Sequence, residues 1–134
     1  MPVTPKVRAL RGATTVELGG APLPDLARDA TQELLTRLLA RNGLTPVDVI
    51  SALFTLTPDL HSAAPALAAR ELGWLDVPML TATEAPSEHS LPRCIRVMLH
   101  VETTRERAEM RHVYLRGAIV LRPDLADDAD AGAH

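Results

Sequence analysis

Residues 93–102, RCIRVMLHVE, place an apolar side chain at every second position. This two-residue period is that of a β-strand with one face in a hydrophobic core. The apolar face carries Ile95, Val97, Leu99 and Val101, which leaves Cys94, Arg96, Met98 and His100 on the other face. A guanidinium stays charged at any physiological pH and presents a fixed fork of donors. Arg96 therefore requires an anion or a pocket rich in carbonyl groups.

Two further arginines, Arg11 and Arg122, also lie within apolar, strand-like runs. Several such forks indicate a site for a small ligand that carries carboxylates. Each arginine taken alone is equally well explained as a structural residue whose charge is satisfied by carbonyls or by an internal carboxylate. The individual residues do not decide between these two interpretations.

Four other segments are expected to be strands. Residues 6–16 form the first one, with Val7, Ala9 and Arg11 on one face, and Gly12 permits a bulge or a close approach. Residues 47–57 are long and apolar, as in a strand buried on both faces, and residues 77–83 form a short strand. Residues 112–123 read as a last strand or strand pair, broken near Gly117.

Helices are expected between these strands. Asp25 is a plausible N-cap for an amphipathic helix that runs to about Asn42. Ser62 is expected to cap a short Ala-rich helix with Pro65 in its first turn, ended by Gly73. A loop at 84–92 and a helical turn at 103–111 complete the order, and the small, acidic residues after Leu125 are expected to be disordered.

Composition narrows the class of protein. The 134 residues suit one domain, expected at 1–125 with a C-terminal tail at 126–134. The net charge of −3 and the lack of a basic patch beside aromatic residues argue against nucleic acid as a partner. No apolar run reaches the length of a signal peptide core or of a membrane span, so we expect a soluble, cytoplasmic protein with no membrane partner.

The usual catalytic signatures are missing. The chain has no GxSxG, GxxxxGK[ST], HExxH or GxGxxG motif, and its five histidines have no ligand spacing. We therefore expect no metal and no cofactor. Cys94, the single cysteine, excludes an internal disulfide and is better read as a small buried hydrophobe than as a nucleophile.

Six blocks taken together resemble one family. They are VRALRGATTVE, TPDLHSAAPALAARELGW, VPMLTATE, RCIRVM, RHVYL and VLRPDL. In order and spacing they are similar to the monofunctional chorismate mutases of the trimeric α/β type first known from Bacillus, over about residues 6–125. The resemblance implies an α+β fold, a mixed β-sheet packed with helices, and a trimeric pseudo-α/β-barrel with active sites between subunits.

The resemblance also implies roles for residues. Arg96 would contact the breaking ether oxygen and a carboxylate, Glu84 the ring hydroxyl, and both Arg11 and Tyr114 a substrate carboxylate. Positions near the mouth or wall of the site are matched by Arg70, Leu121 and Arg122. Thr81 replaces a cysteine that helps to hold the ring hydroxyl in the best-known member. Ala64 and Leu67 stand where that member has a large aromatic residue and a lysine.

The implied reaction agrees with the residues present. The Claisen rearrangement of chorismate to prephenate is unimolecular, so it needs no nucleophile, proton shuttle, metal or cofactor. It needs a compact substrate conformer and a donor for the charge that grows on the ether oxygen. Two alternatives remain open on sequence alone: a trimeric enamine or imine deaminase-like protein, and a non-catalytic trimer that binds carboxylates.

Overall fold

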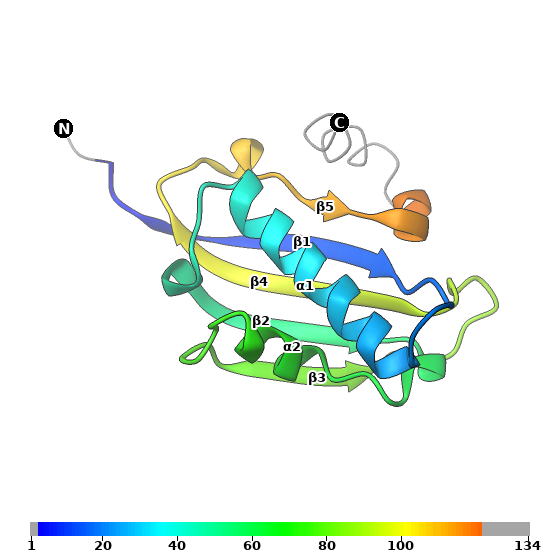
Figure 1. The fold of residues 1–134 in the computed structure, drawn as a ribbon. Helices are drawn as coiled ribbons and strands as arrows, with labels where there is room; N and C mark the ends of the chain where they lie inside the picture. Colours follow the sequence, from blue (N-terminus) through cyan, green and yellow to red (C-terminus); the bar gives the residue numbers. More distant parts are fainter. Residues whose placement is uncertain (1–2, 122–134) are drawn as a thin grey trace.

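A single mixed sheet of five strands organises the chain (Figure 1). The computed structural model describes residues 3–121. The strands lie in the order β3-β2-β4-β1-β5, with β4 antiparallel to both β1 and β2, while β3 runs parallel to β2 and β5 parallel to β1. Their bounds are β1 Lys6–Thr15, β2 Val49–Leu56, β3 Met79–Thr83, β4 Cys94–Thr103 and β5 Val113–Tyr114. The predicted α+β class with a mixed sheet is confirmed.

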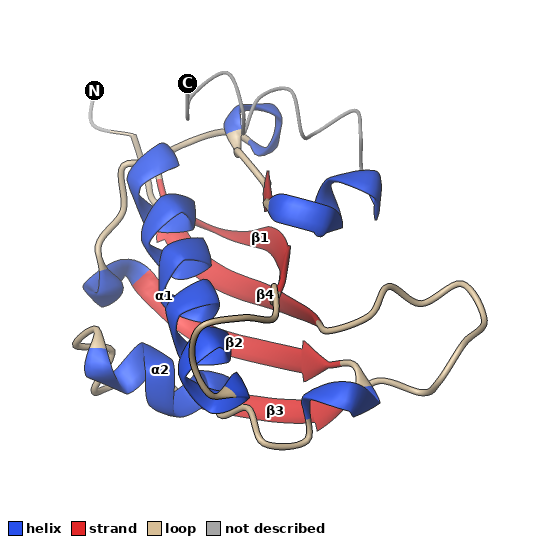
Figure 2. Cartoon of the chain, turned by 45° about the vertical axis from the view of Figure 1, so that its right-hand side comes forward, coloured by secondary structure: helices blue, strands red, loops and turns tan. Residues whose placement is uncertain are grey.

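Both α-helices cover the same face of the sheet (Figures 1 and 2). α1 spans Leu23–Arg41 and crosses the strands, and α2 spans Pro65–Glu71 near β3. Short 3-10 turns, η1 Pro46–Asp48, η2 Pro58–Leu60, η3 Arg107–Glu109 and η4 Arg116–Leu121, connect or follow the strands. Within the described residues, no helix combines the length and the apolar character needed to cross a membrane.

The core lies between α1 and the sheet. Leu34 and Leu38 of α1 pack in one apolar cluster with Leu10 of β1 and Phe54 of β2. The alternation predicted for β4 is confirmed, since each of its four apolar residues is at most 3 % exposed, at Ile95, Val97, Leu99 and Val101. Arg96 accordingly lies on the face of the sheet that neither α-helix covers, which we call the open face.

The prediction that residues 47–57 are buried on both faces is wrong for this chain. Leu53 of β2 is 44 % exposed, and its neighbour in register on β3, Leu80, is 73 % exposed. The cause is that both helices pack on the other side of the sheet, so the open face keeps apolar side chains without a cover inside the chain. Val7 of β1 is exposed on this face as well.

Two helix starts differ from the prediction. Asp25 does not cap α1, because the helix begins at Leu23 with Pro22 at the N-cap position, and Asp25 lies in the first turn. Ser62 does not cap α2, whose N-cap is Ala64. In both cases a proline at the start supplies a backbone angle suited to the first helical turn, which moves the boundary from the polar residue. The predicted end of α2 before Gly73 is confirmed.

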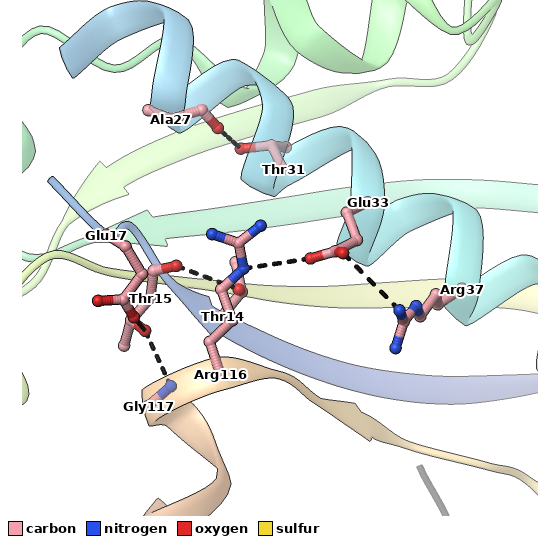
Figure 3. Close-up of polar contacts among 9 residues, drawn as sticks. All are labelled: Thr14, Thr15, Glu17, Ala27, Thr31, Glu33, Arg37, Arg116 and Gly117. Carbon is pink, nitrogen blue, oxygen red and sulfur yellow. Dashed lines mark hydrogen bonds and ion pairs between the residues drawn. The ribbon is translucent and has the colours of Figure 1, made fainter. Parts of the chain in front are cut away.

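The strand predicted at 112–123 is confirmed only for Val113–Tyr114. Arg116 adopts a positive φ of 53° that turns the chain out of the sheet, and η4 follows. Two contacts fix this turn (Figure 3): the Gly117 N–H donates to Thr15 Oγ1 at 2.9 Å, and Arg116 Nε lies 3.3 Å from Glu33 Oε1 of α1. Residues from Arg122 onward, including the predicted tail, lie outside the described part of the chain.

Gly12 lies in close contact with α1, which agrees with the close approach that the sequence allowed there. A Cβ built there would lie 2.8 Å from Leu38 Cδ1 and 3.2 Å from the carbonyl oxygen of Val113. We expect Gly12→Ala to lower the free energy of unfolding by about 1–3 kcal/mol through overpacking. Urea denaturation of the two proteins would measure this loss, and an unchanged midpoint would contradict the close packing of α1 on β1.

Candidate active site

Strand register assembles one row of side chains across the open face. Ala13 of β1 pairs with Tyr114 of β5 on one side and with Arg96 of β4 on the other, and Arg96 pairs in turn with Thr55 of β2. Paired residues on adjacent strands point to the same face of a sheet. Tyr114, Ala13, Arg96 and Thr55 therefore share that face, although they are distant in sequence.

A cavity of about 180 Å³ opens beside this row. Its lining brings two of the predicted arginines together, and consists of Arg11, Leu53, Thr55, Arg96, Val97 and Met98. The volume is below the roughly 300 Å³ at which small-molecule pockets typically begin. A single chain thus supplies a charged depression smaller than a complete ligand pocket.

Glu84 contacts the arginine at the centre of the row. Its Oε2 lies 3.2 Å from Arg96 Nε and accepts a hydrogen bond from Thr55 Oγ1 at 2.7 Å. The Arg96–Glu84 contact has the distance of an ion pair without hydrogen-bond geometry, so Nε is left without a hydrogen-bond partner. Both side chains are mostly buried, at 33 % and 20 % exposure, which reduces the screening of their attraction by water.

The site holds polar groups that the described residues do not satisfy. Tyr114 is 1 % exposed, and its hydroxyl has no hydrogen-bond partner within residues 3–121. The partly buried Arg11 has a backbone N–H bonded to His112 Nδ1 at 3.0 Å, whereas its guanidinium forms no ion pair with any described residue. Buried polar groups are normally paired. The guanidinium of Arg11 and the phenol of Tyr114, both without such partners, favour a ligand that accepts hydrogen bonds and carries negative charge.

The other predicted site residues do not line the cavity beside Arg96. Leu121 of η4 packs against the cluster that contains Tyr114, on the site side. Thr81 pairs with Phe54, a core residue under α1, so its side chain is on the helix-covered face away from Arg96. Arg70 is exposed on α2. The structure thus brings together Arg11, Glu84 and Arg96, keeps Tyr114 and Leu121 beside them, and separates Thr81 and Arg70 within one chain.

Ala64 and Leu67 line a different cavity, of about 240 Å³, between the start of α1 and α2. Arg28 borders this cavity but is paired with Asp25 at 3.6 Å and with Asp29 at 3.4 Å. Its charge is therefore already balanced inside the chain.

Two site residues were not found from the sequence. Thr55 contacts Glu84 and lines the cavity, and Ala13 separates Tyr114 from Arg96. The two-residue period places Ala13 on the same face of its strand as Arg11, and Thr55 on the face opposite to Phe54. Only the register between strands shows that Thr55 lies directly opposite Arg96.

Two other groups near the site have shifted pKa values. Burial raises the pKa of the Cys94 thiol to about 11, as expected for a small buried hydrophobe. Burial would also raise the pKa of Asp59, but hydrogen bonds from the Thr57 hydroxyl and the Arg93 backbone N–H lower it overall. Among residues 3–121, no three His, Cys, Asp or Glu side chains are grouped as metal ligands.

The raised pKa of Cys94 yields a direct prediction. At pH 8 the native thiol is almost entirely protonated and enclosed, so we expect negligible alkylation by iodoacetamide over an hour. The same protein in concentrated urea should react completely, which serves as the control. Rapid modification of the native protein, followed by mass spectrometry, would contradict the burial of this residue.

Fold and site together define an α+β protein with a depression lined by two arginines on the open face of a mixed sheet. The sequence model of the family chorismate mutase type I matches residues 7–125 of this chain. The chain belongs to the chorismate mutase type I family.

Individual relatives agree with this assignment. The chain is 48 % identical to chorismate mutase AroH of Thermus thermophilus over 120 residues, covering 89 % of this chain and 96 % of that protein. It is 42 % identical to chorismate mutase AroH of Bacillus subtilis over 121 residues, covering 90 % and 93 %. Among solved structures, a chorismate mutase from Clostridium thermocellum matches with a TM-score of 0.78 and 44 % identity, covering 84 % of this chain and 98 % of that one.

Proposed function

We propose that the chain converts chorismate to prephenate at the cavity beside Arg96, as an isomerase of aromatic amino-acid biosynthesis. In this reaction the ether C–O bond breaks while a C–C bond forms within the same molecule, and no proton is transferred. The enzyme acts by selecting the compact conformer and by stabilising the charge that develops on the ether oxygen. Family membership supports this activity, and the deaminase-like alternative has no support from the relatives.

Arg96 is the main catalytic group in this proposal. Its position between Ala13 and Thr55 holds the guanidinium over the open face, and Glu84 fixes its Nε side. The terminal nitrogens then face the developing oxyanion as preorganised donors. Glu84 also accepts a hydrogen bond from the ring hydroxyl of the substrate as a carboxylate.

Arg11 and Tyr114 are assigned to the two carboxylates of the substrate. Arg11 lines the cavity with Arg96, and the Tyr114 hydroxyl is buried without a partner within the described residues. Leu121 provides an apolar wall next to Tyr114. We assign Arg70, Thr81 and Arg122 to the mouth of a site completed by a second subunit.

The observation that carries the proposal is the juxtaposition of Arg11 and Arg96 in one cavity with so few internal partners for their charge. The test is to follow the loss of chorismate absorbance with purified protein, using an imine substrate as the control reaction. Turnover of chorismate alone is expected. Imine hydrolysis without chorismate loss would overturn the assignment.

Replacement of Arg96 should abolish most of the activity. Loss of one preorganised oxyanion donor typically costs about 3–4 kcal/mol, or roughly 100- to 1000-fold in rate, so Arg96→Ala should lose at least this much. Arg96→Lys keeps the charge without the planar fork and should be severely impaired as well. The control is Arg37→Lys on α1, outside the site, which should leave kcat unchanged. A folded Arg96→Ala protein with near-normal turnover would refute the role of Arg96.

We also propose that the active form is a homotrimer whose sites lie between subunits. Three features support it: the cavity of one chain is small, the open face carries exposed Leu53 and Leu80, and Thr81 and Arg70 lie apart from Arg96 within one chain. Apolar residues exposed together on a sheet face are typical of an interface. One subunit therefore carries two separate groups of site residues, and neither group forms a complete site alone.

Native mass spectrometry should therefore find three copies of the 14.5 kDa chain. Leu53→Asp places a charge on the open face and should shift this mass toward the monomer, with a parallel loss of activity. An active monomer at micromolar concentration would contradict the shared site.

A further inference from the structure

We propose that Thr55 is a positioning residue, which holds the Glu84 carboxylate in the orientation that orders Arg96. This inference rests on the proposed function and adds a residue to its machinery. Thr55 Oγ1 and Glu84 Oε2 are 2.7 Å apart, a short contact for a hydroxyl and a carboxylate. The same oxygen of Glu84 lies 3.2 Å from Arg96 Nε.

The direction of the hydrogen bond follows from the groups. An ionised carboxylate only accepts, so the Thr55 hydroxyl must donate its single proton to Glu84. Thr55 lies opposite Arg96 in the pairing of β2 with β4, so Glu84 spans two residues that the sheet already holds rigidly. One carboxylate oxygen is thereby fixed from both sides.

The backbone of Glu84 is held by its own hydrogen bond, but this bond does not orient the carboxylate. Its N–H donates to the carbonyl oxygen of Leu56 at 2.7 Å, which continues the pairing of β3 with β2 by one residue. The mostly exposed loop 85–92 begins directly afterward. The backbone bond fixes the Cα atom but leaves the side-chain torsions of Glu84 free. The contacts of Oε2 with Thr55 and Arg96 restrain these torsions, and of the two only the contact with Thr55 is a hydrogen bond.

Two variants of Thr55 test this role, and a third variant, at Thr83, serves as the control. Thr55→Val replaces the hydroxyl by a methyl group of nearly equal size and keeps the β-branched side chain that suits a strand. Because hydrogen bonds to charged groups are among the stronger ones, we expect kcat to fall roughly 10- to 100-fold. Thr55→Ser restores the donor and should recover kcat to within about threefold of the parent protein.

Thr83→Val is the matched control. Thr83 directly precedes Glu84, but it pairs with Leu56, a core residue, and so faces away from the open side. The same chemical change there should leave kcat unchanged. Thermal melting of all variants separates loss of orientation from loss of fold, since a positioning role predicts lower kcat at a nearly unchanged Tm.

A double-mutant cycle isolates the contact with Glu84. If Thr55 acts through Glu84, Thr55→Val should have little further effect on kcat in a Glu84→Ala background. Equal falls in kcat in both backgrounds, or failure of Thr55→Ser to recover activity, would overturn the inference. A parent protein without any turnover of chorismate would instead refute the proposed function, so the two failures are distinguishable.

Discussion

Ten residues of β1 pair with ten of β4 in one uninterrupted antiparallel register, from Lys6 opposite Thr103 to Thr15 opposite Cys94. The backbone hydrogen bonds of this ladder determine which side chains share the open face. A slip of one residue would turn Arg96 into the core under α1 and would expose Ile95 and Val97. The apolar alternation of β4 opposes such a slip, so the core that stabilises the sheet also orients its charged residues.

The cavity on the open face has more positive than negative side chains around it. Two guanidinium groups share one cavity, and a single carboxylate, Glu84, lies against one of them. Partial burial of an unpaired cation is unfavourable, and Arg11 has no ion pair with a residue of 3–121, so an anion in this cavity would be stabilised. A dianionic substrate would remove this cost on binding. Leu53, Val97 and Met98 also line the cavity, and an apolar surrounding strengthens such an attraction.

Sequence patterns were sufficient to predict β1 to β4, the two helices and the face on which Arg96 lies, because each feature depends on residues close in sequence. The helix starts were misplaced since proline outweighed the nearby polar residues Asp25 and Ser62. The end of β5 was missed because it depends on a positive φ at Arg116 and on contacts with Thr15 and Glu33 from distant elements. The role of Glu84 came from family resemblance, whereas the contact of Glu84 with Thr55 required the register of three strands.

Ala13 separates Tyr114 from Arg96 in the row across the open face, and it contributes only a methyl group. Strands are spaced about 4.8 Å apart, so the two polar groups emerge from backbones roughly 10 Å from each other. The methyl group is itself buried, at 1 % exposure, in the apolar cluster that Tyr114 forms with Cys94 and Ala118. A larger residue at position 13 would overpack this cluster, so the distance between the phenol and the guanidinium is maintained by apolar packing and not by charge.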